Sequence, residues 1–263
     1  MSQQSILDKV STQQSWACLC DVKQQPVLAE ALTKASSIES LISQLESLPV
    51  TLKDNHRSLV KCGNMVMIER ALGRSLEVVA KRPVDKHRRR LSRLSSMLVA
   101  GEAAATIENL AKLKNAGIQS VTPLFALEKR RNGQIVDSWM CYEYRQGSSC
   151  DEQDMDDIIK FLNQMHASGF RHGDPTWSNF LRDESGELFT IDTKAKPCRG
   201  AFHATQDFLL FKGANGLDKL EIASVMPVDR ASLGYWAARL YVGFKAVRSG
   251  LRDRIKKNRP KNS

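Results

Sequence analysis

The sequence predicts an α+β fold with two lobes, the first built mainly of strands and the second mainly of helices. In residues 55–145, short β-branched runs lie on both sides of one amphipathic segment. After residue 150 the apolar residues change to helical spacing, which continues to the C-terminus. A chain of 263 residues is long enough to form one large domain or two small lobes with a buried core. We therefore expect a first lobe over residues 55–145 and a second over 146–263.

Residues 1–54 differ in composition from the rest of the chain. They are rich in Ser and Gln, and Leu41, Leu45 and Leu48 recur at helical spacing before Pro49. These features predict a largely helical N-terminal extension. They do not indicate its role, and both a packed extension and a mobile tail fit the pattern.

The first lobe is expected to open with strands. The segments "RSLVKCGN" and "MVMIER" read as two short strands around a turn at Gly63-Asn64. A third β-branched run, "LEVVAKRP", ends at Lys81. The segment "GEAAATIENLAKLKNAGI" then predicts a helix, with Glu102 in its first turn and Gly117 at its end.

The first lobe ends in a predicted strand pair, and the second begins with a helix. The strands are "TPLFALEKR" and "IVDSWMCYEY", joined by the polar turn "RNG". The acidic run "DEQDMDD" then opens a helix that continues as "IIKFLNQMHASGF", as the helix dipole favours. A loop "RHGDPTWSNF", a polar turn "RDESGE" and a short strand "LFTID" follow, before mostly helical sequence and a basic tail.

The charge of the chain indicates an acidic partner. Its net charge is +10 and its pI is near 9.4, which suits nucleic acid, an anionic membrane surface or a phosphorylated substrate. We do not expect nucleic acid, because no nucleic-acid motif or aromatic stacking array accompanies the charge.

The six cysteines form no CxxC pair and are expected to be free thiols. The N-terminus does not resemble a signal peptide, and no apolar run approaches the roughly 18 residues of a spanning helix. We expect a cytoplasmic protein with peripheral membrane contact.

The loop "RHGDPTWSNF" holds the most informative polar residues. By itself, Gly-Asp-Pro is an ordinary turn sequence. However, Asp174 is followed by four residues and then by Asn179, which fits the pattern H-x-D-x-x-x-x-N of phosphoryl-transfer enzymes. Asp192 ends the next predicted strand, while Lys81 and Glu102 lie upstream on a strand and a helix. This order of five polar residues predicts a phosphoryl-transfer site.

Each of these residue types has a use in moving a γ-phosphoryl group, where positioning and charge neutralisation dominate. Lys81 would bind the α- and β-phosphates of ATP, held in place by an ion pair with Glu102. Asn179 and Asp192 would supply oxygen ligands to Mg²⁺, a hard cation that prefers them. Asp174 would be the catalytic base that accepts the proton of the attacking hydroxyl or orients that hydroxyl.

These residues resemble the protein-kinase-like superfamily, and within it the bacterial lipopolysaccharide core heptose kinases. The resemblance covers roughly residues 55–215 and rests on "VVAKRP", "GEAAATIENLAKLKNAGI", "CYEYRQG", "HGDPTWSNFL" and "IDTKAK". It implies a two-lobed kinase fold in which adenine binds near the backbone of Glu143 to Arg145. It also implies a kinase that uses ATP and Mg²⁺ on a heptose hydroxyl of the lipopolysaccharide inner core. The acceptor would be an anionic glycolipid at the cytoplasmic face of the inner membrane.

The chain departs from the protein-kinase pattern in ways that favour a small-molecule acceptor. Gly173 replaces the arginine of H-R-D, Asp192-Thr193-Lys194 replaces D-F-G, and no A-P-E follows. The Gly-rich loop is reduced to Gly63, which leaves open a non-catalytic pseudokinase that binds a membrane-assembly partner. A kinase for a protein or another small alcohol also remains an alternative.

Other polar residues have two interpretations each. Asp207 would either hydrogen-bond the catalytic loop from below or be a solvated residue of a helix start. His172 is expected to hold the loop, and Trp177 to line the sugar site or pack within the loop. The basic residues 86–93 and the C-terminal basic tail would either dock a membrane or the acceptor, or serve solubility.

Overall fold

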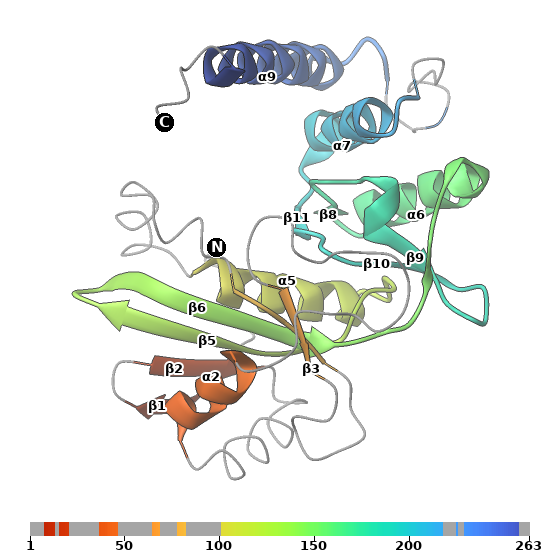
Figure 1. Ribbon diagram of the computed structural model, residues 1–263. Coiled ribbons are helices and arrows are strands. Elements are labelled where there is room, and N and C mark those ends of the chain that lie inside the picture. The colour runs from red at the N-terminus through yellow and green to blue at the C-terminus, as the bar shows by residue number, and fades with distance from the viewer. Residues whose placement is uncertain are drawn as a thin grey trace. The chain divides into compact units, whose positions relative to one another are not determined.

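The computed structural model describes residues 8–13, 16–20, 37–46, 65–68, 78–82, 101–217, 225 and 229–257 (Figure 1). The chain divides into two compact units. The first comprises Met1–Ser148 with Arg182–Ile191, and the second Ser149–Leu181 with Asp192–Ser263. The first contains a β-sheet and the second is mainly helical, so the expected mixture of α and β structure is confirmed.

A sheet with the strand order β1-β2-β5-β6-β4-β3 forms the centre of the first unit (Figure 1). Neighbouring strands are antiparallel throughout this order. The order is not sequential, because β4 pairs with β6 at the far edge of the β5–β6 hairpin and β3 then pairs with β4. The strands are β1 Asp8–Gln13, β2 Trp16–Cys20, β3 Met65–Ile68, β4 Val78–Lys81, β5 Pro123–Arg131 and β6 Gln134–Glu143.

The N-terminal segment corrects the expectation of a largely helical extension. Residues 8–13 and 16–20 form two strands, and β2 pairs with β5 in the main sheet. Alternate side chains of β2, those of Trp16, Cys18 and Cys20, are buried, as the period of a strand requires. Helix α2, Ile38–Glu46, does form at the predicted position. Its buried face, which includes Leu41 and Leu45, joins the same hydrophobic cluster as β2, while Leu48 lies outside the described residues.

The predicted strand pair of the first lobe is confirmed as β5 and β6. The turn between them has positive φ at Asn132 (51°) and Gly133 (75°). Positive φ at both central residues gives the twist that a tight hairpin needs, and Asn and Gly are the residues that tolerate it. Strands β3 and β4 lie where the sequence predicted them, but the predicted strand and turn before residue 65 fall outside the described residues, as do residues 86–93.

Helix α5, Glu102–Asn115, packs on β5 and β6 through a buried face that includes Ile107 and Leu110. It ends as predicted, with Gly117 at φ 75°. The Gly117 N–H donates to Lys114 O at 3.1 Å, and the Ile118 N–H donates to Leu113 O at 3.1 Å. This pair of bonds satisfies the last carbonyls of the helix in a Schellman motif.

The described residues of the second unit include three long helices: α6 Met155–Ala167, α7 Gly200–Ala214 and α9 Leu233–Lys257. The 3-10 helix η2, Glu152–Asp154, precedes α6 and is capped by Asp151, which accepts the Gln153 N–H at 2.8 Å. A short strand pair and a second 3-10 helix lie between α6 and α7: β8 Phe170–Arg171, η3 Trp177–Asn179 and β11 Lys196–Pro197.

Three further strands form a small sheet in the order β10-β9-β7: β7 Ser148–Ser149, β9 Phe180–Arg182 and β10 Leu188–Thr190. Among the residues that the structure describes, no helix has the length and apolarity to cross a membrane.

Candidate active site

The loop between β8 and β9 holds Asp174 and Asn179 in a compact turn. The Asp174 carbonyl oxygen accepts the Thr176 N–H at 2.9 Å and the Asn179 Nδ2–H at 2.8 Å. The Thr176 carbonyl in turn accepts the Asn179 N–H at 2.9 Å. These hydrogen bonds engage the backbone carbonyls of Asp174 and Thr176, while the Asp174 residue is exposed. The loop therefore presents the carboxylate of Asp174 to solvent from a fixed backbone.

Asp207, on α7, anchors this loop from inside the second unit. The residue is 0% exposed. Its two carboxylate oxygens accept the backbone N–H of His172 at 2.6 Å and of Gly173 at 2.9 Å. The Nε2 atom of His166 lies 3.2 Å from Asp207 Oδ2. Buried bonds from N–H groups to a carboxylate are among the stronger ones in proteins, so the first interpretation of Asp207, as a support for the loop, is confirmed.

Asn215, at the C-terminal end of α7, is a second anchor that the sequence did not reveal. Its Oδ1 accepts the Trp177 N–H at 2.9 Å, and its Nδ2 donates to the carbonyls of Pro175 at 3.2 Å and Phe211 at 2.8 Å. The ring of Trp177 lies edge-on to that of Phe211, with centroids 4.9 Å apart. Trp177 therefore packs within the second unit, which supports the loop-packing interpretation of this residue.

Asp192 lies beside the loop because the residues after it bond to His172. The Lys194 N–H donates to His172 O at 3.0 Å, and the Thr193 hydroxyl donates to the same carbonyl at 3.3 Å. Asp192 is exposed and has φ 48°, a left-handed conformation that a non-glycine residue adopts at a cost. The structure thus brings Asp174, Asn179 and Asp192 into one region of the second unit, as the motif spacing predicted.

Two of the departures from the protein-kinase motifs, at Gly173 and at Lys194, lie next to each other. A Cβ built on Gly173 would lie 3.4 Å from Lys194 Cδ, 3.5 Å from its Cβ and 3.8 Å from its Cγ. Gly173 has φ 82°, which suits glycine. The aliphatic stem of Lys194 therefore covers the glycine that stands where H-R-D has arginine. Lys194 itself stands two residues after Asp192, at the position where D-F-G has its glycine.

His172 has the structural role expected of it. The imidazole is fully buried and stacks near Phe180, with ring centroids 4.9 Å apart. Its Nδ1 accepts the Asp174 N–H at 3.3 Å, which requires a neutral ring with the proton on Nε2. Burial lowers the pKa of His172 from 6.5 to about 4, although the carboxylates of Asp207 and Asp192 act in the opposite direction. The ring therefore stays neutral near pH 7 and holds the Asp174 backbone.

This pKa predicts a loss of stability in mild acid. Below about pH 6.5, His172 is protonated in the unfolded chain but stays neutral in the folded protein. The free energy of unfolding therefore falls as the pH falls. At about 1.4 kcal/mol per pH unit, the loss between pH 6.5 and pH 5 is about 2 kcal/mol. Urea denaturation of the wild-type protein and of His172→Asn at both pH values measures it. The asparagine variant, whose Oδ1 can still accept the Asp174 N–H, should lack this part of the loss. Equal pH dependence in both proteins would contradict the assignment.

The other predicted site residues, Lys81, Glu102, Glu143 and Arg145, belong to the first unit. Lys81 is the last residue of β4 and pairs in register with Met140 of β6. Glu102 is the first residue of α5, which packs on β6. Both are half-buried, and their ion pair stays a prediction. Glu143 ends β6, and its N–H donates to Thr122 O at 2.8 Å.

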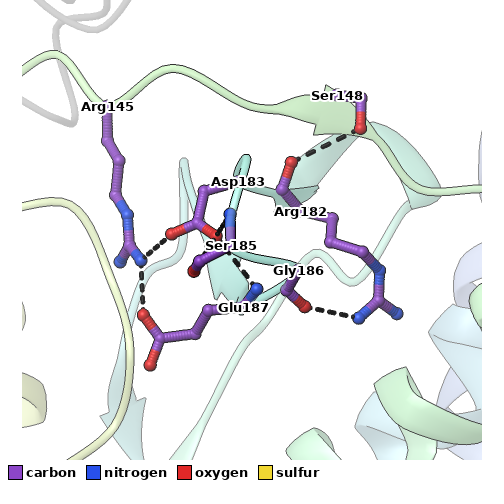
Figure 2. A network of polar contacts seen from close by, with 7 residues as sticks. All are labelled: Arg145, Ser148, Arg182, Asp183, Ser185, Gly186 and Glu187. Atoms are coloured by element: carbon purple, nitrogen blue, oxygen red, sulfur yellow. Dashed lines mark hydrogen bonds and ion pairs between the residues drawn. The ribbon is translucent and has the colours of Figure 1, made fainter.

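Arg145 has partners that sequence reasoning missed (Figure 2). Its guanidinium forms ion pairs with Asp183 and with Glu187, which both lie in the predicted turn "RDESGE". It also lies over the ring of Phe189, 4.3 Å from the centroid. Hydrogen bonds from Ser185 and from Arg145 lower the pKa of Asp183. Because the side chain of Arg145 is engaged in this network, a contribution to adenine binding would come from its backbone groups, as the resemblance implies.

A cavity of about 350 Å³ lies at the same end of β6. All of its lining residues belong to the first unit. They come from the end of α5, the segment that follows it and the residues after β6. The lining includes Lys114, Ser120, Thr122, Glu143, Tyr144 and Arg145.

In the described part of the chain, no cluster of three or more His, Cys, Asp or Glu side chains could hold a metal ion. The predicted ligands of Mg²⁺ are an amide and a carboxylate, Asn179 and Asp192. Asn179 donates from Nδ2 to Asp174 O, which assigns its Oδ1 as the atom for a cation. Oxygen donors of this kind suit Mg²⁺, which keeps several water or phosphate oxygens in its shell.

Comparison with known proteins places the chain near two solved structures. No family model matches the sequence, and no curated protein matches it. The structure of WaaP in complex with acyl carrier protein is similar at 13% identity and a TM-score of 0.44, over 82% of this chain and 90% of that chain. The structure of WbdD with a kinase inhibitor is similar at 18% identity and a TM-score of 0.38, over 63% of this chain and 42% of that chain.

Proposed function

We propose that this protein is an ATP-dependent kinase that phosphorylates a heptose hydroxyl of the lipopolysaccharide inner core. The observation that carries the proposal is the loop around Asp174. An exposed carboxylate stands on a backbone tied to the fully buried Asp207, with Asn179 bonded to the carbonyl of the same residue. Fixing a catalytic group in this way lowers the entropy cost of reaching the reactive geometry.

Asp174 acts on the acceptor in this proposal. Its carboxylate accepts the proton of the attacking hydroxyl or orients it, and the hydrogen-bonded turn prevents the backbone from moving away. Asn179 and Asp192 are the residues that would hold Mg²⁺, which supplies charge neutralisation at the phosphates. The left-handed backbone of Asp192 supports this assignment, because strain of this kind is typical of functional residues.

The first unit would bind the nucleotide. Lys81 would contact the α- and β-phosphates, and Glu102 would orient it. The backbone groups from Glu143 to Arg145 would hydrogen-bond the adenine, and the ion pairs of Arg145 would keep that segment in place. The net charge of +10 suits an anionic glycolipid acceptor at the cytoplasmic face of the inner membrane.

The decisive variant is Asp174→Ala. We expect it to abolish phosphate transfer from radiolabelled ATP to purified core oligosaccharide, while ATP binding measured by calorimetry is retained. A general base typically contributes a factor of about 10²–10⁴ in rate, so the residual rate should fall by at least about a hundredfold. Asp156→Ala, which removes an equally exposed carboxylate from α6, is the matched control and should keep full activity.

The alternatives give different results in the same assay. Label that enters a protein extract or a small alcohol, and not core oligosaccharide, would indicate a kinase for another acceptor. A wild-type protein that binds magnesium-ATP and transfers no label would be a pseudokinase. Unchanged transfer by Asp174→Ala would refute the catalytic assignment itself.

A further inference from the structure

Helix α9 has one apolar face that packs within the second unit. Tyr235 and Ala238 on this face are buried, and α9 contacts α7. The contact is close at Gly234, where an added Cβ would lie 2.9 Å from the backbone nitrogen of Phe202. Packing against α7 therefore accounts for the small and buried residues of α9.

A second apolar face of α9 is exposed. Among the described residues, the large hydrophobic side chains with high exposure all lie on this helix. Leu240 is 75% exposed and Phe244 is 69% exposed. Residues separated by three or four positions lie on one side of a helix, so five of these side chains form one line about 21 Å long. We call this line the exposed stripe: Leu233, Trp236, Leu240, Phe244 and Val247.

The helix that carries the exposed stripe is strongly basic. Leu233–Lys257 contains seven Lys or Arg residues and one acidic residue, Asp253, so its net charge is 7 − 1 = +6 of the +10 of the chain. Arg239 is exposed and lies over the rings of Tyr235 and Trp236, with its guanidinium carbon 5.7 Å and 5.4 Å from the ring centroids. A cation thus lies directly beside the apolar stripe.

We infer that α9 is an interfacial helix that docks the protein on an anionic membrane, with the exposed stripe inserted at the boundary between headgroups and acyl chains. Helices that lie in this plane combine Trp, Phe and Leu on one face with many Lys and Arg residues. The stripe supplies the apolar area, and the +6 charge supplies attraction to anionic lipids. A spanning orientation does not fit, because seven cations in 25 residues are too many for a hydrocarbon core.

Vesicle flotation of the full-length protein tests this inference. The probes are phosphatidylcholine vesicles and vesicles of phosphatidylcholine with about one third phosphatidylglycerol, a composition that imposes a negative surface potential. We expect binding to the anionic vesicles only. The double variant Leu240→Glu/Phe244→Glu should bind at least about tenfold more weakly, because it removes two inserted side chains. Lys160→Glu lowers the net charge by the same two units at an exposed site on α6 and should bind nearly as well as the wild-type protein.

Fluorescence shows whether the stripe inserts. Quenching by brominated lipid should appear in the wild-type protein and be reduced in Trp236→Phe, which removes only the tryptophan of the exposed stripe. Equal loss of binding in Lys160→Glu and the double variant would overturn the inference, because charge alone would then explain binding. So would self-association or capture of an acidic protein through the stripe without vesicle binding. These measurements need no catalysis, so their failure would leave the proposed phosphoryl transfer intact, and inactivity would not affect them.

Discussion

Replacing Asp207 by alanine is expected to lower the free energy of unfolding by about 3–5 kcal/mol, because two buried N–H groups lose their charged acceptor. These are the backbone groups of His172 and Gly173, at 2.6 Å and 2.9 Å from the carboxylate. The loop that carries Asp174 would lose its fixed position at the same time. Transfer of phosphate should therefore fall even at a low temperature where the variant is still folded. Urea denaturation and the radiolabel assay measure the two effects.

Two further variants separate these effects. Asp207→Asn keeps one carbonyl oxygen that can accept an N–H, so its loss of stability should be smaller than that of the alanine variant. Asp229→Ala removes an exposed carboxylate that accepts the N–H of Ala231 at 2.9 Å, and should cost about 1 kcal/mol or less. If Asp207→Ala lowers the free energy of unfolding no more than Asp229→Ala does, Asp207 does not hold the loop.

Replacing Gly101 by alanine is expected to destabilise the first unit by about 2–3 kcal/mol through overpacking. An added Cβ would lie 2.1 Å from Glu128 Oε1 and 2.5 Å from Ile135 Cδ1, distances that real atoms do not adopt. Glu128 is 2% exposed, and its carboxylate lies at the N-terminal end of α5, where Oε1 accepts the Ala104 N–H at 3.4 Å. The substitution would move the start of α5 or the carboxylate. It should raise the KM for ATP, because Glu102 begins the same helix.

A double-mutant cycle tests whether space at Glu128 is the cause. Glu128→Ala should destabilise the protein alone, because it removes the partner of the helix terminus and of Arg130. The double variant Gly101→Ala/Glu128→Ala should lose less free energy of unfolding than the sum of the losses in the two single variants. Gly213→Ala is the matched control in a helix, since a Cβ there has no neighbour within 4 Å. Additive costs, or equal costs at Gly101 and Gly213, would refute the steric explanation.

Short sequence patterns predicted those elements that depend on residues close together in the chain. The hairpin turn of β5 and β6 and the end of α5 follow from Asn132-Gly133 and Gly117, where the backbone needs positive φ. The strands β1 and β2 were missed for a different reason. The pairing of β2 with β5 joins residues more than one hundred positions apart, so the alternation in "WACLC" does not reveal its partner. Without that partner, the Ser- and Gln-rich composition favoured a helical extension.

The candidate site shows the same division. The spacing of Asp174, Asn179 and Asp192 predicted that they lie together, because a fixed number of residues in one loop restricts where the side chains can go. Asn215 carries no such signal. An asparagine at a helix end is an ordinary cap, and its bonds to Pro175 and Trp177 depend on how α7 packs under the loop. The ion pairs of Arg145 likewise join segments 38 and 42 residues apart.

The sequence by itself determined the order of the described elements from residue 65 onward, the residues of the candidate site and the strongly basic character of the C-terminal helix, because these depend on residue type and on short spacings. The tertiary structure decided which residues hold the site: Asp207 and Asn215 under the loop, and Lys194 over Gly173. It also decided which face of α9 packs on α7 and which face stays exposed. Such contacts depend on the packing of segments distant in the chain, and helical periodicity alone cannot tell two apolar faces of one helix apart.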